Sequence, residues 1–359
     1  MLGKKSRAIF ALVGAVTLLI TIGFSLVSKS SIKYNSTNMV AECKKSQACY
    51  IEYVKNSFKA KGLDYTITLL TEAASKNGAV LDCHIVAHEL GRVAYDKYGR
   101  EILKRYIPIC SEGFNHGVID RASDTLPISS YADFFGRYCL KNPDLKTGCV
   151  HGIGHVLAIK KVTPKATQGI CDEIATMIYK KYPLPSDPIL ASNIDISGSC
   201  VDGYVMENID NKGKVQILSM KESYCKGFTG SAEYYCIFEY SRAAVRSSGV
   251  KNALKNLDLY HRYCASIKDN YYIAGCGFSM GEVVEELYHS KNPRYTIDQY
   301  EKNCQGSEIY SKSCTIGFIS KMVNFNIINE NSPDYCDIKD ESLKEYCREN
   351  LASLLRNKK

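Results

Sequence analysis

The sequence contains no Cys-x-x-Cys pair and no phosphate-binding loop, and these absences exclude several classes of protein. Without Cys-x-x-Cys we expect no zinc ribbon, no thioredoxin-type redox centre and no attachment site for haem c. Gly152-Ile-Gly154 lacks the third glycine of a dinucleotide-binding fingerprint. His88-Glu89 does not open a His-Glu-x-x-His motif, because position 92 is Arg, so the sequence also argues against a zincin-type metalloprotease.

Two further features of the sequence argue against other common functions. Gly277-Phe-Ser279-Met-Gly281 has the spacing of a nucleophile elbow, but that motif needs a preceding strand and a histidine late in the chain. The only later histidine is His289, ten residues on. The net charge of +8 is spread along the chain without a long basic block. We therefore expect a mild preference for anionic surfaces and no specific binding of nucleic acid.

One long apolar run is present, and it lies at the N-terminus. Residues 8–27 carry no charge, and twenty residues are enough to cross a hydrocarbon core of roughly 30 Å as one helix. Lys4, Lys5 and Arg7 precede this run, so the positive-inside rule places residues 1–7 in the cytoplasm and the bulk of the chain outside it. We predict a single-pass, uncleaved signal anchor, with cleavage as a signal peptide as the alternative.

The chain contains 16 cysteines, and outside the cytosol they are expected to form disulfides. Six of them open a short common phrase, and the intervals between the six are 39, 51, 36, 40 and 38 residues. Such a period indicates a structural repeat. The phrases are Cys110-SEGFNHG, Cys149-VHGIGHV, Cys200-VDGYVME, Cys236-IFEYSRA, Cys276-GFSMGEV and Cys314-TIGFISK, and Cys347-RENLASLL ends the series as a degenerate copy.

Each repeat is predicted to consist of two helices. The phrase opens the second helix, as in 149–162 and 276–287, where apolar residues recur on one helical face. An earlier helix precedes the phrase and closes with a cysteine of its own, and turn signals such as Asn142-Pro143 separate the two. The predicted first helices are 131–139, 215–225, 253–264 and 295–304.

The two cysteines of one repeat lie close enough in sequence for a disulfide to join its two helices. Each closed loop would contribute roughly 2–3 kcal/mol by restricting the unfolded chain. Cys171 and Cys200 are a longer version of the same pairing, whereas Cys43, Cys49, Cys83 and Cys110 do not follow the rule and are left unassigned. The predicted short pairs are Cys139–Cys149, Cys225–Cys236, Cys264–Cys276, Cys304–Cys314 and Cys336–Cys347.

Stacked two-helix units of about 38 residues form α-solenoids. In unit length and paired cysteines, roughly residues 130–350 resemble the Sel1-like, tetratricopeptide-related family in its secreted, cysteine-rich form. The resemblance implies an interaction scaffold whose concave face binds a protein or peptide. We predict an all-α, right-handed αα-hairpin solenoid stapled by disulfides, on one transmembrane helix. Its expected parts are a cytoplasmic tail (1–7), the anchor (8–27), a polar stalk and first helix (28–60), His-rich repeats (61–210) and C-terminal repeats (211–359).

The histidines are concentrated in one part of the chain. Five of the seven lie between positions 84 and 155, and only His261 and His289 lie elsewhere. Residues at i and i+4 project from one face of a helix. Pairs with this spacing are His84/His88, Glu112/His116, His151/His155 and Asp202/Met206, and the last three occupy equivalent positions of successive repeats.

This arrangement predicts a metal site, because stacked helices would bring the pairs together. The predicted ligands of Zn, Fe, Mn or Cu are His84, His88, Glu112, His116, His151, His155 and Asp202. If the metal activates water or dioxygen, the bases are Glu89, Glu112 or Asp202. Two alternatives remain open at this point: the histidines pack in the core as hydrogen-bonded residues, or the protein is a scaffold without catalytic activity.

Overall fold

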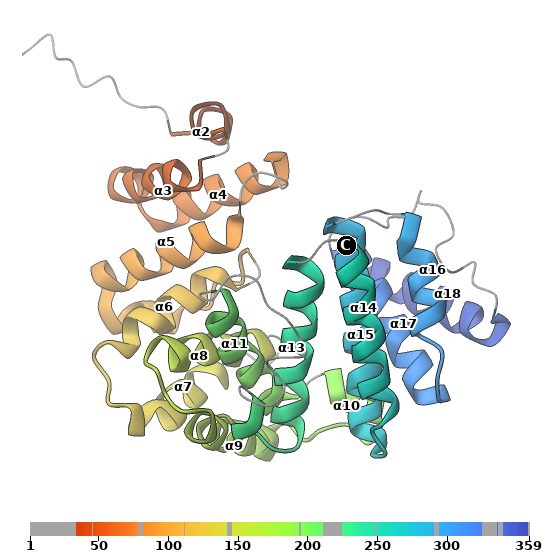
Figure 1. Ribbon diagram of the computed structural model, residues 1–359. Helices are drawn as coiled ribbons and strands as arrows, with labels where there is room; N and C mark the ends of the chain where they lie inside the picture. Colours follow the sequence, from red (N-terminus) through yellow and green to blue (C-terminus); the bar gives the residue numbers. More distant parts are fainter. Residues whose placement is uncertain are drawn as a thin grey trace, which may run out of the picture. The chain divides into compact units, whose positions relative to one another are not determined.

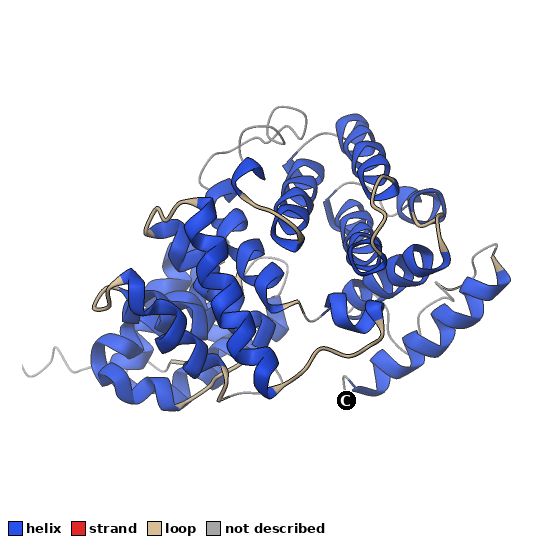
Figure 2. Cartoon of the chain, turned by 90° about the horizontal axis from the view of Figure 1, so that it is seen from below, coloured by secondary structure: helices blue, strands red, loops and turns tan. Residues whose placement is uncertain are grey.

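A computed structural model describes most of the chain. The described residues are 34–44, 46–77, 82–110, 112–141, 146–193, 195–210, 225–247, 250–290, 294–324, 336 and 340–357. Within these ranges every regular element is a helix, and no strand occurs (Figures 1 and 2). The all-α class predicted from the sequence is therefore confirmed for the part of the chain that the structure describes.

No helix among these residues has both the length and the apolar character needed to cross a membrane. The predicted anchor, residues 8–27, lies outside the described residues. The anchor thus stays a prediction.

The chain divides into two compact units, residues 1–83 and 84–359. In the first unit, α2 (Ser36–Cys43), α3 (Gln47–Lys61) and α4 (Leu63–Asn77) pack against one another. Met39, Tyr50 and Leu70 are fully buried there, so these helices have a small apolar core of their own. We expected residues 28–60 to be a polar stalk that leads into a first helix; α2 and α3 occupy the described part of that range.

The second unit carries the remaining helices. They are α5 (Cys83–Tyr98), α6 (Gly113–Ser123), α7 (Tyr131–Cys139), α8 (Lys146–Ile159), α9 (Pro164–Lys181), α10 (Pro188–Asn193), α11 (Ile196–Asp210), α13 (Ser231–Ser247), α14 (Val250–Ala265), α15 (Asn270–Ser290), α16 (Arg294–Asn303), α17 (Glu308–Asn324) and α18 (Glu341–Asn357). Short 3₁₀ segments are η1 (Gly99–Lys104), η2 (Ile128–Ser130) and η4 (Cys225–Gly227).

The helices that carry the repeated phrases contact one another in chain order. α6 packs on α8, α8 on α11, α11 on α13, α13 on α15, and α15 on α17 (Figure 1). α7 packs on α8 and α14 on α15, so in these two repeats the first helix covers the second. α16, the first helix of the next repeat, also packs on α15.

The disulfides follow the predicted rule. All six predicted pairs are formed, with Cα atoms 5.5 to 5.7 Å apart: Cys139–Cys149, Cys171–Cys200, Cys225–Cys236, Cys264–Cys276, Cys304–Cys314 and Cys336–Cys347. Of the four unassigned cysteines, Cys43 pairs with Cys49, and Cys83 and Cys110 are also disulfide-bonded. No free thiol is present among the described residues.

The second helices begin earlier than predicted. We expected each to open at its cysteine, but α8 begins three residues before Cys149, and α15 begins six residues before Cys276. α7 ends at Cys139, as predicted, whereas predicted helix 215–225 falls mostly outside the described residues. The Cys139–Cys149 and Cys264–Cys276 disulfides therefore join the end of one helix to the first or second turn of the next, whereas Cys171 lies in the middle of α9.

Glycines let neighbouring helices approach until their backbones touch. A Cβ atom on Gly203 of α11 would lie 2.0 Å from the His151 carbonyl oxygen, and one on Gly154 of α8 would lie 2.0 Å from the Cys200 carbonyl oxygen. No side chain fits at such distances. The same reciprocal contact joins α15 to α17, through Gly281 and Gly317.

The crossing of α5 and α6 is built in the same way. Gly91 lies against the Phe114 carbonyl oxygen, and Gly117 lies against the His88 carbonyl oxygen. His88 of α5, His151 of α8 and Phe278 of α15 are thus equivalent, because each offers its carbonyl to the partner's glycine. Each of these three residues lies opposite the residue that precedes the contacting glycine. The resulting pairs are His88/His116, His151/Asp202 and Phe278/Ile316. At these two positions the α5–α6 and α8–α11 crossings have polar residues, whereas the α15–α17 crossing has apolar ones.

Candidate functional site

The five histidines between positions 84 and 155 gather in one place in the second unit. His116 of α6 is at the centre, and its ring centroid lies 5.1 to 6.4 Å from the centroids of the other four rings. His84 and His88 approach it from α5, and His151 and His155 from α8. We call these five residues the histidine cluster. The histidines of the His84/His88 and His151/His155 pairs thus lie near His116.

Hydrogen bonds fix the tautomers of two of these rings. His116 Nε2 lies 2.9 Å from the Gly148 carbonyl oxygen, and His84 Nδ1 lies 3.1 Å from the Cys110 carbonyl oxygen. A carbonyl oxygen only accepts, so each of these nitrogens carries the proton. The other nitrogen of each neutral ring then has a lone pair.

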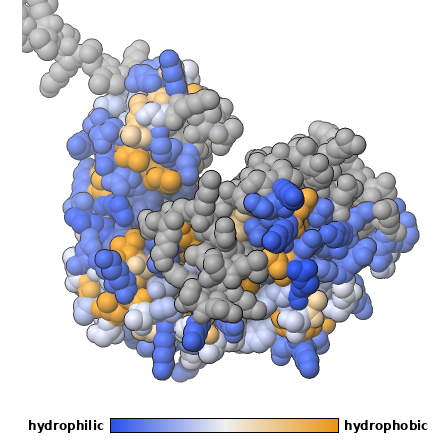
Figure 3. All heavy atoms as spheres, in the orientation of Figure 1, coloured by the Kyte–Doolittle hydropathy of each residue, from blue (hydrophilic) through white to orange (hydrophobic). Residues whose placement is uncertain are grey.

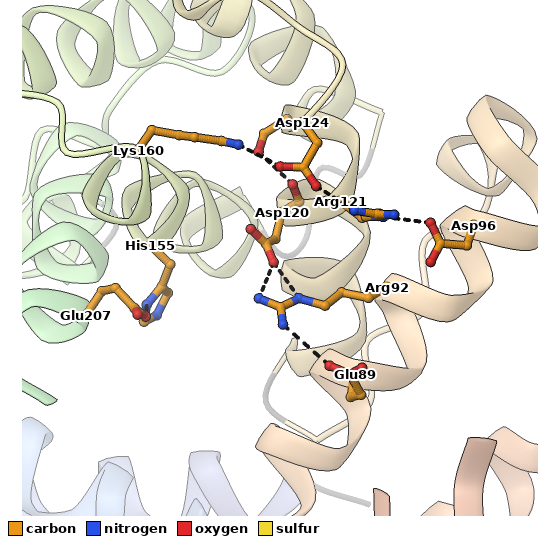
Figure 4. Close-up of polar contacts among 10 residues, drawn as sticks. Glu89, Arg92, Asp96, Asp120, Arg121, Asp124, His155, Lys160 and Glu207 are labelled. Atoms are coloured by element: carbon orange, nitrogen blue, oxygen red, sulfur yellow. Dashed lines mark hydrogen bonds and ion pairs between the residues drawn. The ribbon is translucent and has the colours of Figure 1, made fainter. Parts of the chain in front are cut away.

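His155 is held by a carboxylate on the neighbouring helix. Its Nδ1 lies 2.9 Å from Oε2 of Glu207 on α11, and Figure 4 shows the two side chains facing one another. An ionised carboxylate only accepts, so Nδ1 carries the proton and Nε2 is left as an acceptor. A carboxylate in this position fixes both the tautomer and the orientation of an imidazole.

Two imidazole nitrogens in the cluster are buried acceptors. His116 Nδ1 and His155 Nε2 have no hydrogen-bond partner among the described residues, and the two residues are 2% and 7% exposed. Their ring centroids are 5.5 Å apart. Leaving a buried polar group unpaired costs about 1–3 kcal/mol. The pair therefore needs an explanation beyond packing.

The polar region continues from the histidine cluster into α11 and α13. His151 Nδ1 lies 3.1 Å from Oδ2 of Asp202, and the carboxyl groups of Asp202 and Glu239 are neighbours. Arg242 Nη2 lies 2.9 Å from the Glu239 carboxyl group and 3.7 Å from Sδ of Met206. Asp202 and Glu239 are only 13% and 3% exposed in their side chains. We call Asp202 and Glu239 the carboxyl pair.

Burial determines the protonation state of these groups. Burial lowers the pKa of His88 to about 3, with a further contribution from Arg92, and lowers the pKa values of His116 and His151 well below the usual range. These imidazoles are therefore neutral at physiological pH. Burial raises the pKa of Glu239 to about 8, although Arg242 acts in the opposite direction, and it also raises the pKa of Asp202.

Ion pairs lie beside the cluster on α5 and α6. Arg92 contacts Asp120 and lies 3.4 Å from Glu89, while Arg121 lies 2.6 Å from Asp96 (Figure 4). Arg92 is four residues after His88, just as His155 is four residues after His151. Arg92 thus occupies on α5 the position that His155 occupies on α8, and it places a cation there instead of an imidazole.

The predicted metal site is wrong. Within the described ranges, no three or more His, Cys, Asp or Glu side chains form a group that could hold a metal ion. The seven proposed ligands do not converge on one point, because several are committed elsewhere. Glu112 accepts hydrogen bonds of 2.6 Å from Tyr106 and Asn115, and His116 and His84 direct one nitrogen each to a backbone carbonyl. A site for Zn, Fe, Mn or Cu is therefore not assigned.

The three predicted bases also have other roles. Glu89 pairs with Arg92 on the same helix, and Glu112 is bound to Tyr106. Burial raises the pKa of Glu112, against the hydrogen bonds from Tyr106 and Asn115. Asp202 contacts His151 and Glu239, so it is part of the polar region, but it is not the base of a metal-bound water.

Two important residues were not among the predicted site residues. Glu207 follows the repeat position of Met206 by one residue, and Glu239 lies three residues after Cys236, where four of the other phrases have glycine. Because most of the other repeats have glycine at this position, the carboxylate of Glu239 could have been recognised from the sequence as unusual. His261 lies outside the cluster, where its Nε2 is 3.2 Å from the Gln305 carbonyl oxygen.

Comparisons with known proteins do not identify the site. No family model, no curated protein and no solved structure matches the chain. Its function must therefore be inferred from the geometry of the cluster.

Proposed function

We propose that the histidine cluster is an acid–base site in which His155, oriented by Glu207, takes a proton from a bound hydroxyl group or water. The observation that carries this proposal is the pair of buried acceptor nitrogens, His116 Nδ1 and His155 Nε2, which have no partner within the described part of the chain. Two such acceptors side by side suit a ligand that offers hydrogen-bond donors.

The third crossing, that of α15 and α17, bears on His151 and Asp202 alone, because at the positions of His155 and Glu207 it carries another polar pair, Glu282 and Lys321, 3.3 Å apart. α15 and α17 make the same reciprocal glycine contacts as α8 and α11, but they have Phe278 and Ile316 in place of His151 and Asp202. The crossing therefore forms without polar groups at these positions. Polar residues that a fold does not need, and that cost free energy when buried, are expected at functional sites.

The proposed chemistry follows from the arrangement of His155. Its Nε2 lone pair accepts the proton of a hydroxyl group or water, and the O–H electron pair stays on the oxygen, which becomes the nucleophile. Glu207 stabilises the imidazolium ion that forms and holds the ring in place. His116 Nδ1 accepts a second hydrogen bond from the ligand and so fixes its position.

Hydrolysis of p-nitrophenyl acetate by the oxidised, full-length protein tests the proposal, because a general base or an imidazole nucleophile accelerates it. His155→Gln should lower the rate constant roughly 10²-fold, and Glu207→Gln should lower it less, because the imidazole remains. His261→Gln is the matched control and should leave the rate unchanged. A His155→Gln protein that hydrolyses the ester as fast as the unmodified protein would show that His155 is not a base.

The location and the finer fold form part of the same proposal. The formed disulfides and the basic flank of residues 8–27 support a membrane-anchored protein whose site faces an oxidising compartment. The contacts of α6, α8, α11, α13, α15 and α17 in chain order support an αα-repeat superhelix. A reporter enzyme that works only outside the cytoplasm, fused to the C-terminus, should be active; a C-terminus protected from protease in intact cells would contradict the topology.

A scaffold function stays a prediction from the Sel1-like resemblance. On the face drawn in Figure 3, apolar residues occur in small patches between hydrophilic ones. Exposed large apolar side chains such as Ile85, Ile128 and Ile159 lie on different helices or segments. Neither observation indicates where a protein partner would bind, so the acid–base site is the better supported function.

A further inference from the structure

Two surface hollows occur beside disulfides in the C-terminal repeats. The first hollow, of about 240 Å³, lies between the end of α14 and the start of α17, and Cys264 lines it. The second hollow, of about 260 Å³, lies between the end of α16 and the start of α18, and Cys304 lines it. Neither hollow is lined by a residue of the histidine cluster, so they are separate from the proposed acid–base site.

The two hollows occupy equivalent positions of successive repeats. Each is lined by the residue three before the cysteine of a first helix, and by the residues seven and four before the second cysteine of the following repeat. The equivalent residues are His261 and Glu301, Ser307 and Asp340, and Tyr310 and Leu343. A surface feature that recurs from one repeat to the next suits an extended ligand, because stacked repeats form an extended surface.

The turn at Gln305 and Gly306 separates the hollows and lines both of them. The Gln305 carbonyl oxygen lies 3.2 Å from Nε2 of His261, which holds the turn in place. Gly306 is exposed, and its N–H and carbonyl groups make no hydrogen bond within the described residues. A side chain would not fit there, because an added Cβ would lie 2.7 Å from Cδ1 of Tyr310. One backbone donor and one acceptor are thus open between the hollows, as a peptide backbone requires.

The two hollows differ in their chemistry. Ile267, Ile273 and Tyr310 give the first hollow an apolar lining. Two carboxyl groups, those of Glu301 and Asp340, line the second. Asp340 Oδ1 accepts hydrogen bonds from the first turn of α18, whereas Oδ2 makes none within the part of the chain that the structure describes. An apolar side chain therefore suits the first hollow, and a cationic one suits the second.

We infer that the two hollows and the turn between them bind an extended peptide of a partner protein, with an apolar side chain in the first hollow and Lys or Arg in the second. The site does not rest on the proposed acid–base function. The protein as a whole has a net charge of +8, so a basic side chain is attracted by the local carboxylates against the overall charge.

The spacing of the repeats selects the conformation of the peptide. Contacting helices lie about 8–10 Å apart, so equivalent hollows of successive repeats are separated by about the same distance. In a polyproline II helix, residues three apart lie on one face and about 9.3 Å from each other. In a β-strand, residues on one face are about 6.6 or 13 Å apart, which fits less well. The peptide is therefore a polyproline II segment whose apolar and basic residues are three positions apart.

An array of acetylated octapeptides on a Pro-rich background tests this inference with the oxidised, full-length protein. Each peptide carries one Leu and one Lys, in either order, with separations of two to five positions. Binding should be strongest at a separation of three, and replacing Lys by Glu should abolish it. A second set of peptides with Leu in place of Lys shows how much of the binding depends on the positive charge.

Variants locate the binding on the protein. The double variant Glu301→Gln, Asp340→Asn should weaken the best peptide about tenfold, because two exposed ion pairs are lost. Asn retains the helix cap at position 340. The matched control is Glu101→Gln, Asp133→Asn, which changes the net charge equally at exposed carboxylates outside both hollows. It should bind the peptide like the unmodified protein.

The first hollow has a test of its own. Ala265 lines it and is exposed, so Ala265→Trp should fill the hollow and weaken binding at least about tenfold. Ala60→Trp, at an exposed position of α3, is the control and should have no effect. Circular dichroism confirms that each variant is folded.

Hydrogen exchange in the unmodified protein is the measurement that needs no variant. A bound peptide that accepts from the Gly306 N–H should slow exchange of that amide at saturating peptide. The docking site is overturned if no peptide of the array binds, if binding does not depend on the separation of Leu and Lys, or if Gly306 exchanges equally fast with and without peptide. Equal affinities for the unmodified protein and the Glu301→Gln, Asp340→Asn variant would overturn it as well.

Discussion

Gly203 lies directly against the backbone of His151, so that a methyl group on Gly203 would be 2.0 Å from the His151 carbonyl oxygen. This contact sets the separation of α8 and α11, and with it the distance between His151 and Asp202 and between His155 and Glu207. The close approach of two backbones is thus what assembles the polar site.

Gly203→Ala should therefore destabilise the protein, because the added methyl group meets backbone atoms that cannot rotate away. We expect a loss of about 3 kcal/mol in the free energy of unfolding. Gly169→Ala in α9 is the matched control: nothing lies within 4 Å of its added Cβ, so it should stabilise by about 0.5–1 kcal/mol through helix propensity. Urea unfolding of the two variants measures both, and equal stabilities would contradict the close crossing.

Replacing His151 and Asp202 by the apolar residues that occupy the equivalent positions of α15 and α17 should preserve the fold. The double variant His151→Phe, Asp202→Ile places the residues of the α15–α17 crossing between α8 and α11. Replacing a buried polar pair by apolar residues of suitable size is often neutral or stabilising by about 1–4 kcal/mol. Asp202→Ile alone should be less stable than the double variant, because it leaves His151 Nδ1 without its acceptor. Circular dichroism and urea unfolding compare the three proteins; an unfolded double variant would show that the polar pair is structural.

Stability should pass through a maximum near pH 6.5. His88, with a folded pKa of about 3, binds its proton in the unfolded chain but not in the folded protein between about pH 6.5 and pH 3, so stability falls as the pH falls, by about 1.4 kcal/mol per pH unit for each such histidine. Glu239 acts in the opposite sense. With a folded pKa of about 8, it keeps its proton longer when folded, so stability falls as the pH rises from about 4.5 to 8.

Below pH 6.5 the three histidines with lowered pKa values, His88, His116 and His151, act together against the buried carboxyl groups. Glu239 has a pKa of about 8, so its effect extends above pH 6.5, where these histidines no longer contribute, and this places the maximum near pH 6.5. Glu239→Gln should remove the decline on the alkaline side and leave the acid side in place. Thermal unfolding at a series of pH values tests this. A profile that keeps its alkaline decline in Glu239→Gln would assign the decline to another group.

The disulfides should contribute according to the length of the loop that each closes. Cys264 and Cys276 are 12 residues apart, and Cys171 and Cys200 are 29 apart. Replacing the first pair by Ala should cost about 2–3 kcal/mol, and replacing the second about 0.8 kcal/mol more, because the longer loop restricts the unfolded chain further. Peptide mapping without reduction checks both bridges, and unfolding measurements check the order.

The sequence was sufficient for features that depend on local pattern. The period of the cysteine phrases predicted paired helices and the bridges between them, as in Cys139–Cys149, because residues about ten apart at a helix–turn–helix junction have few other partners. The i, i+4 spacing of His151 and His155 placed both on one helical face, and repeat equivalence indicated that His116 would join them. These conclusions need only helix periodicity and the order of the repeats.

Tertiary structure alone decided what those residues do. Spacing shows which side chains meet, but a metal site also requires their nitrogens and oxygens to point at one position, and the backbone carbonyls of Gly148 and Cys110 turn His116 and His84 elsewhere. The partners that matter, Glu207 for His155 and Glu239 for Asp202, come from other helices at a register that the glycine contacts set. Burial then fixes the protonation states, since the loss of water around a side chain depends on packing from every direction and on no local pattern in the chain.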